Sequence, residues 1–193
     1  MFLVEQTGIP ASELPLPQFR THLRLGSGFS DDTIQNAVLE SALRAAMTQI
    51  EGQCAKAILI RNFLWTLGAW RDLSRQTLPR APVIDVNELA IVNLDGTREV
   101  IAPNRYTLVR DTHRPAIVAR GFMLPQIPIG GHAEIGFRAG YGANWREVPS
   151  DLGLAVLSLA AAQYEDRVAS GALPPGVSAI LSTYRQPRMF GGF

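Results

Sequence analysis

The side chains that could carry out catalytic chemistry are few and lie far apart in the sequence. The three histidines, His22, His113 and His132, fall in three regions, and none has an HxH, HExxH or HxxxH partner. The only cysteine, Cys54, lies on the apolar side of a predicted helix, which favours a buried structural thiol over a nucleophile. We therefore predict no catalytic residue, no metal site and no cofactor. A small hydrolase or transferase using His113 or His132 is the less favoured alternative.

The acidic pair Asp31-Asp32 and the glycines also have structural explanations. Asp31 and Asp32 follow Ser30 and suit the start of a helix, where carboxylates accept free N–H groups. The glycines between 130 and 142 form neither GxGxxG nor GxxxxGK[ST], so they predict turns and no phosphate cradle.

Composition indicates an ordinary globular protein. The chain has 193 residues, 47% of them hydrophobic and 18% charged, and a net charge of +1. Lys56 is its only lysine, and we interpret its arginines as scattered, so no surface that grips DNA is indicated. We expect no signal peptide and no membrane span, because the N-terminus lacks a basic region and no apolar run reaches 18 residues.

The most informative stretch runs from Val148 to Ser170. Pro149, Ser150 and Asp151 are typical of a helix start, and the next residues are almost all small or aliphatic up to the charged run 165–167. A helix that is apolar on every side must be covered all round. We expect it to form either the centre of the core or a wall between subunits.

The remaining elements predict an α+β fold that is mainly helical. Helices are expected at 17–25, 31–56, 150–170 and 175–184, forming a bundle of about four helices. Residues 58–142 contain short β runs, broken by prolines and by the Asp95-Gly96 hairpin signal, and predict a small inserted antiparallel β region. Residues 1–184 are expected to form a single domain, and 185–193 an extended C-terminal tail.

The helix expected over 31–56 has two apolar families at helical spacing. One contains Ile34, Val38, Ala42 and Ala45, and the other runs from Leu39 to Cys54. This wide stripe predicts two packing partners, one inside the subunit and one outside. The tail combines aromatic residues with Arg185 and Arg188, which are the preferred anchors of protein interfaces.

The order of these motifs resembles one family of proteins. The residues that carry the resemblance are His22-Leu23-Arg24, Asp31-Asp32, Leu59-Ile60, Trp65, Leu78-Pro79, Pro82, Asp95-Gly96, Tyr106, Phe137 to Gly142, Val148-Pro149, Leu152, Ala155, Tyr164 to Arg167, Leu173-Pro174 and Tyr184-Arg185. Together they resemble the head–tail connectors, or adaptors, of tailed phages and of phage-derived gene transfer agents.

The resemblance implies a structural role at the head–tail junction of a particle assembled in the host cytoplasm. The subunit would join a dodecameric ring, bind the portal protein and the next tail-completion (stopper) protein, and extend a channel for double-stranded DNA without sequence-specific contacts or a dense arginine belt. A DNA-binding packaging accessory, marked by a localised arginine stripe, is the other alternative.

The same resemblance implies two sets of contact residues. The portal-binding set is Tyr184, Arg185, Arg188, Met189, Phe190 and Phe193. The subunit-interface set is Leu39, Leu43, Met47, Leu154, Tyr164, Glu165, Asp166 and Arg167.

Overall fold

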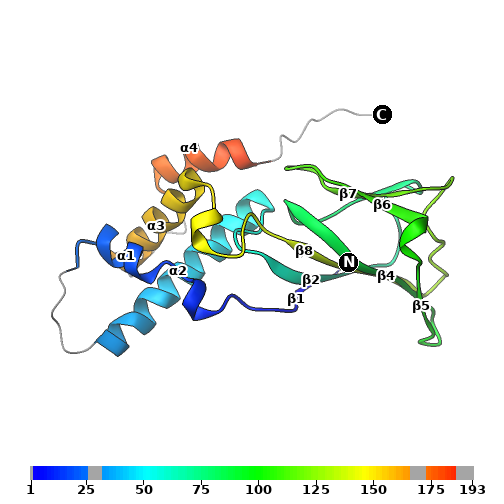
Figure 1. The fold of residues 1–193 in the computed structure, drawn as a ribbon, viewed down its shortest axis with the longest axis horizontal. Helices are drawn as coiled ribbons and strands as arrows, with labels where there is room; N and C mark the ends of the chain where they lie inside the picture. The colour runs from blue at the N-terminus through cyan, green and yellow to red at the C-terminus, as the bar shows by residue number, and fades with distance from the viewer. Residues whose placement is uncertain (1, 26–31, 166–172, 186–193) are drawn as a thin grey trace. The chain divides into compact units, whose positions relative to one another are not determined.

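The described chain divides into two compact units. The computed structural model describes residues 2–25, 32–165 and 173–185. Unit 1 consists of residues 1–8 and 59–141, and unit 2 of residues 9–58 and 142–193. Unit 1 is built from strands and unit 2 from helices (Figure 1).

Unit 1 contains a five-stranded antiparallel sheet in which neighbouring strands are distant in the sequence. In spatial order its strands are β1 (Phe2–Glu5), β2 (Arg61–Leu67), β8 (His132–Ala139), β4 (Val83–Val92) and β5 (Arg98–Val100). The Asp95-Gly96 turn joins β4 to β5 as predicted, with Gly96 at φ +84° and the amide of Asn93 donating to the Thr97 carbonyl at 2.9 Å.

The two faces of this sheet differ because side chains alternate along each strand. Phe63 and Phe137 lie opposite each other on the buried face, with ring centroids 5.5 Å apart. On the other face Arg98 pairs with both Glu88 and Glu134, and Arg138 pairs with Asp85 at 2.6 Å. The hydrogen bonds from these guanidinium groups lower the pKa of Glu88 and of Asp85, so both carboxylates are ionised and paired at neutral pH.

Unit 1 also contains a second, three-stranded sheet, which we call the small sheet. Its order is β3 (Arg75–Thr77), β7 (Ala116–Ala119) and β6 (Tyr106–Val109), all antiparallel. Gln76, Ile117 and Tyr106 are buried on one side of it. The Arg110 side chain donates to the carbonyl of Ile84 in β4 at 3.1 Å and so links the small sheet to the larger one.

Unit 2 packs four α-helices around one core. They are α1 (Leu16–His22), α2 (Asp32–Cys54), α3 (Ser150–Glu165) and α4 (Pro175–Tyr184). The helix expected over 17–25 ends earlier, because Arg24 has a φ of +54°. The core is formed by Phe19 of α1, by one face of α2, and by side chains of α3 and α4 that include Leu152, Val156, Leu159, Val177 and Leu181.

The prediction that the chain is mainly helical is wrong. Eight strands accompany four α-helices in the described residues, and the strands form two sheets. Only short β runs were expected in this region, whereas β4 has ten residues, includes the polar Asp85, Asn87 and Glu88, and continues past two irregularities in its pairing with β8. No strand was predicted at β1, because its pairing depends on β2, more than fifty residues away.

Gly140 provides a test of the close backbone approach between the end of β8 and the residues before β2. Its φ is +148°, and a Cβ atom there would lie 2.4 Å from the backbone nitrogen of Ile60. Because backbone atoms block this position, we expect Gly140→Ala to destabilise the protein by about 3 kcal/mol or more. Thermal or urea denaturation measures the loss. Gly68→Ala is the control, since nothing lies within 4 Å of a Cβ at Gly68; equal stability of the two variants would contradict this interpretation.

Candidate assembly surfaces

The described surroundings of each histidine form no group of metal ligands. His22 is exposed at the end of α1 in unit 2, and His113 lies in the β6–β7 loop of unit 1, where its amide donates to Asp111 Oδ1 at 2.7 Å. His132 Nε2 lies 3.6 Å from Glu134 Oε1, but Glu134 also accepts a hydrogen bond from Arg98. The residues that the structure describes contain no cluster of three potential metal ligands and no helix able to cross a membrane.

Cys54 is buried at the end of α2, as predicted. Its thiol is 2% exposed and contacts the carbonyl of Leu181 at 3.9 Å. Burial raises the pKa of the Cys54 thiol, so less of it is present as the nucleophilic thiolate.

The two apolar families of α2 lie on different sides of the helix. Leu39, Leu43 and Met47 are at most 2% exposed and belong to the core of unit 2. Val38 is 51% exposed, and Ala45 is exposed as well. We call the exposed face, formed by Ala37, Val38, Ser41, Ala45 and Thr48, the outer face of α2. The side chain of Ile34 is outside the described residues.

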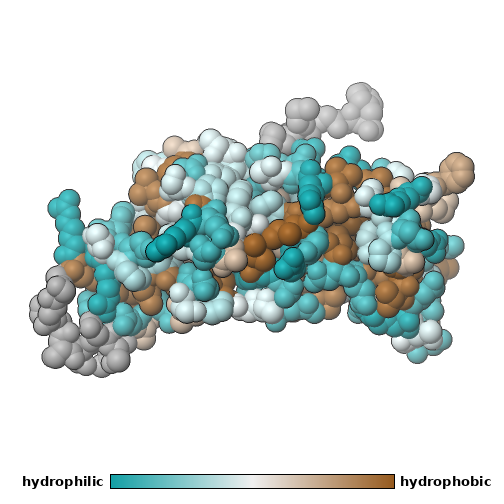
Figure 2. All heavy atoms as spheres, in the orientation of Figure 1, coloured by the Kyte–Doolittle hydropathy of each residue, from teal (hydrophilic) through white to brown (hydrophobic). Residues whose placement is uncertain are grey.

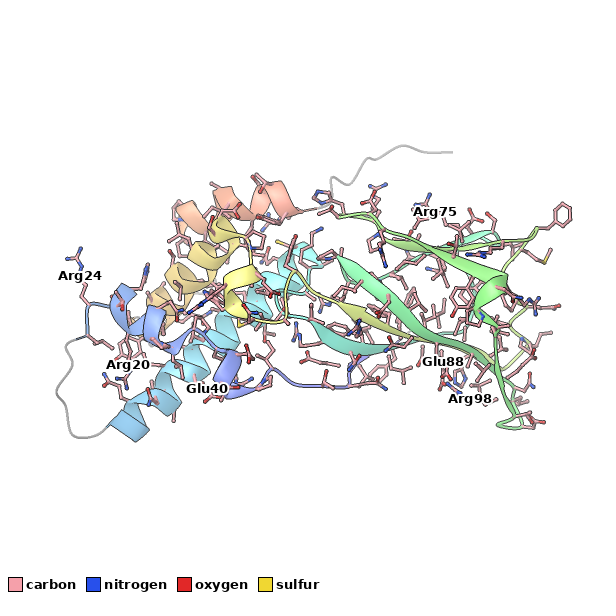
Figure 3. All side chains as sticks on the ribbon, in the orientation of Figure 1. Arg20, Arg24, Glu40, Arg75, Glu88 and Arg98 are labelled. Carbon is pink, nitrogen blue, oxygen red and sulfur yellow. The ribbon has the colours of Figure 1, made fainter. Side chains whose placement is uncertain are left out.

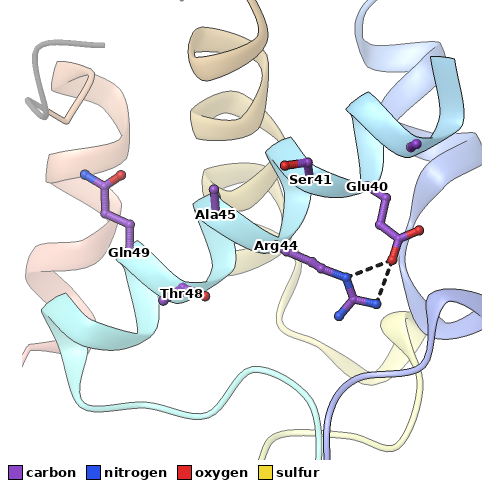
Figure 4. A pocket seen from close by; sticks show the side chains of 7 residues that line it. Glu40, Ser41, Arg44, Ala45, Thr48 and Gln49 are labelled. Atoms are coloured by element: carbon purple, nitrogen blue, oxygen red, sulfur yellow. Dashed lines mark hydrogen bonds and ion pairs between the residues drawn. The ribbon is translucent and has the colours of Figure 1, made fainter. Parts of the chain in front are cut away.

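Two shallow grooves border this outer face. One is lined by Ala37, Ser41, Ala45, Thr48 and Gln49 together with the Glu40–Arg44 ion pair of 2.8 Å (Figure 4). The other contains Val38, Ala42 and Ala45 of α2 and, from α3, Gln163, Tyr164 and Glu165. The structure therefore brings the predicted interface residues Tyr164 and Glu165 to the outer face of α2.

The third helix is not fully covered within unit 2. Leu152, Val156 and Leu159 are buried, whereas Leu154 is 50% exposed. Of the predicted interface set, Leu154, Tyr164 and Glu165 are accessible at least in part, while Leu39, Leu43 and Met47 are enclosed by their own chain. Asp166 and Arg167 lie outside the described residues.

Two residues of the predicted portal-binding set, Tyr184 and Arg185, form hydrogen bonds to other helices of unit 2. The Tyr184 hydroxyl donates to Asp151 Oδ1 at 2.6 Å, which ties the end of α4 to the start of α3. The Arg185 guanidinium donates to Gln53 Oε1 of α2. Arg188, Met189, Phe190 and Phe193 lie outside the described residues.

One cluster of charged residues was missed in the sequence. The arginines are not evenly scattered, because Arg75, Arg105 and Arg120, all exposed, gather at one end of the small sheet, where the amide of Arg120 donates to the carbonyl of Arg105. Arg75 projects from β3 in Figure 3. A count of charge over segments of about twenty residues would have revealed the cluster, although only the fold brings its two segments together.

Solved structures of particle necks match this chain over its full length. No family model matches the sequence, and no curated protein sequence matches it. A chain in the neck of an empty gene transfer agent particle, computed with C6 symmetry, is 48% identical, with a TM-score of 0.91 and coverage of 100% of this chain and 99% of that one. A chain from the native gene transfer agent virion is 47% identical, with a TM-score of 0.89 and the same coverage.

A third match comes from the neck of a native particle computed with C12 symmetry, at 44% identity and a TM-score of 0.86, again covering 100% and 99% of the two chains. The class that the fold and these matches define is a structural protein of a virus-like particle neck. The chain belongs to the head–tail connector family of tailed phages and gene transfer agents. Its place is the head–tail junction of the particle.

The burial of Cys54 predicts its reactivity. We expect the native thiol to react with a disulfide reagent such as DTNB on the order of 100-fold more slowly than in denaturant, because reaction requires opening of the core. Absorbance of the released thiolate at pH 8 follows the reaction. A cysteine placed at the exposed Ser182, in a chain with Cys54→Ala, is the accessible control; similar rates at the two positions would show that Cys54 is accessible.

Proposed function

We propose that this chain is the adaptor subunit of a dodecameric ring that joins the portal to the next tail-completion protein and extends the DNA channel. The observation that carries this proposal is the full-length match, at 44–48% identity, to chains in particle necks computed with C6 and C12 symmetry. Cyclic symmetry of this kind places each subunit between two neighbours through a repeated heterologous contact.

The surface proposed to meet the neighbouring subunit is the outer face of α2 with the end of α3. Small side chains such as Ala37, Ser41 and Ala45 allow another backbone to approach closely, and Val38 supplies apolar surface that unit 2 leaves half exposed. Tyr164 and Glu165 border the same groove and supply polar contacts. Leu154 is a second accessible apolar contact on α3.

The tail is proposed to bind the portal through Arg188, Met189, Phe190 and Phe193. Tyr184 and Arg185 then have a different role, which is to fix the point where the tail leaves unit 2. Their bonds to Asp151 and Gln53 support this assignment, since both link α4 to other helices of the same unit. Duplex DNA would pass through the ring without sequence-specific contacts.

Substitution of Ala45 tests the proposed subunit contact. We expect Ala45→Glu to leave the isolated chain folded, because Ala45 is exposed, but to reduce its incorporation into particle necks about tenfold or more, because a charge would be buried between helices. Quantitative mass spectrometry of purified particles measures incorporation. Ala179→Glu places the same charge on an exposed position of α4; the proposal fails if both variants are incorporated at the wild-type level.

Removal of residues 186–193 tests the proposed role of the tail. This deletion keeps Tyr184 and Arg185, so we expect a folded chain with unchanged thermal stability. We expect DNA-filled heads without attached tails, because the anchors of the portal contact are lost. Negative-stain imaging scores attachment, and a chain whose residues 186–193 are replaced by a Gly/Ser segment of equal length controls for length. Normal tail attachment in the deletion variant would refute this role.

A further inference from the structure

The small sheet concentrates positive charge in a chain that is nearly neutral. The segments 69–81 and 102–125, which form this sheet and its loops, contain seven arginines and two aspartates, a net charge of +5. The whole chain has a net charge of +1, so all other residues together have −4. This concentration of positive charge in the small-sheet segments favours their binding to a negatively charged surface.

Three of these arginines lie at one end of the sheet: Arg75 begins β3, Arg105 precedes β6 and Arg120 follows β7. β3, β7 and β6 place Arg75 opposite Val118 and Val118 opposite Thr107. Beyond this row, the amide of Arg120 donates to the carbonyl of Arg105 at 3.0 Å, so these two residues are neighbours as well. Within the described chain, neither Arg105 nor Arg120 forms a salt bridge, and both side chains are exposed.

The loop after Arg120 presents apolar side chains beside this charge. Phe122 is 100% exposed, Met123 is 56% exposed and Leu73, in the adjoining loop, is 64% exposed. Figure 2 shows hydrophobic atoms standing out beyond the teal surface where this loop of unit 1 ends. Phe122, Met123, Arg105 and Arg120 also border one shallow groove.

The loop is held in place although its tip is exposed. The amide of Leu124 donates to the carbonyl of Leu73 at 2.7 Å, and Trp70 Nε1 donates to the carbonyl of Pro125 at 2.7 Å. Leu124 is 2% exposed and anchors the loop in the interior of unit 1. Because the backbone of this loop is already fixed, binding through Phe122 would restrict only the side chain, as suits an interface anchor.

The combination of residues distinguishes among the possible occupants. Duplex DNA would engage the arginines, but its phosphate backbone offers no apolar pocket for Phe122 and Met123. A second copy of this chain is less suited, because five of its carboxylates, Asp85, Glu88, Glu134, Glu40 and Glu5, are already paired with arginines of their own chain. A different protein with an apolar pocket and an acidic rim would satisfy both features.

We propose that the small-sheet surface formed by Phe122, Met123, Leu73, Arg75, Arg105 and Arg120 docks an acidic-rimmed apolar pocket on another protein of the particle neck. Phe122 fills the pocket and the arginines pair with its rim. The inference rests on the proposed adaptor function and adds to it a third contact surface, formed by unit 1, besides the outer face of α2 and the C-terminal tail.

Photo-crosslinking in assembled particles tests this proposal. The full chain carries p-benzoylphenylalanine in place of Phe122, and particles are isolated and irradiated before mass spectrometry. We expect crosslinks to a segment of a different neck protein that contains Asp or Glu beside apolar residues. A matched probe at Leu94, which is 79% exposed on the β4–β5 hairpin of the same unit, should not label that segment.

Other outcomes overturn the inference. Crosslinks to DNA, crosslinks to a second copy of this chain, or no crosslink in particles that contain the variant each exclude the proposed partner. Electron microscopy of the same particles shows whether the chain occupies the neck; its absence there would instead contradict the adaptor function. The two failures are therefore distinguishable.

Charge reversal provides an independent measurement. Arg105→Glu combined with Arg120→Glu should reduce the crosslink yield from position 122 about tenfold or more, whereas Arg146→Glu, an exposed arginine of unit 2, should leave it unchanged. Circular dichroism confirms that the reversed variant is folded. An unchanged yield in the folded double variant would remove the arginines from the proposed contact.

Discussion

The packing of α3 against α2 is the interaction on which unit 2 depends. Leu152, Val156 and Leu159 meet a core that includes Leu39 and Leu43, and α4 closes this core through Val177 and Leu181. A helix as apolar as α3 requires cover on more than one side. Unit 2 covers one side and leaves Leu154 half exposed, so the same composition that builds the core also leaves apolar surface for a neighbouring molecule.

The sequence predicts local elements of this fold better than their pairing. The apolar run and its capping residues indicate α3, and the Asp-Gly signal indicates the β4–β5 hairpin, because in both cases the decisive contacts lie within a few residues. β8 pairs with β2 and with β4, which are distant in the chain, and no local pattern specifies such partners. The size of the β portion was therefore underestimated.

The sequence also did not reveal which of the candidate contact residues are buried within their own chain. Helical spacing divides α2 into two apolar families, but it does not say which family faces inward. Leu39, Leu43 and Met47 have the larger side chains and take the core, since they bury more apolar area, whereas Val38 and Ala45 remain outside. Tyr164 and Glu165 could be placed near α2 only once α3 was seen beside it.

The distribution of charge in unit 1 bears on the binding of other proteins. A net charge of +1 does not exclude local patches of charge, and here positive charge is concentrated in the segments of the small sheet. On the five-stranded sheet Arg98 and Arg138 are neutralised by their own carboxylates, whereas Arg105 and Arg120 have none among the described residues. Exposed positive charge beside exposed apolar side chains is the combination that a complementary protein surface can bind.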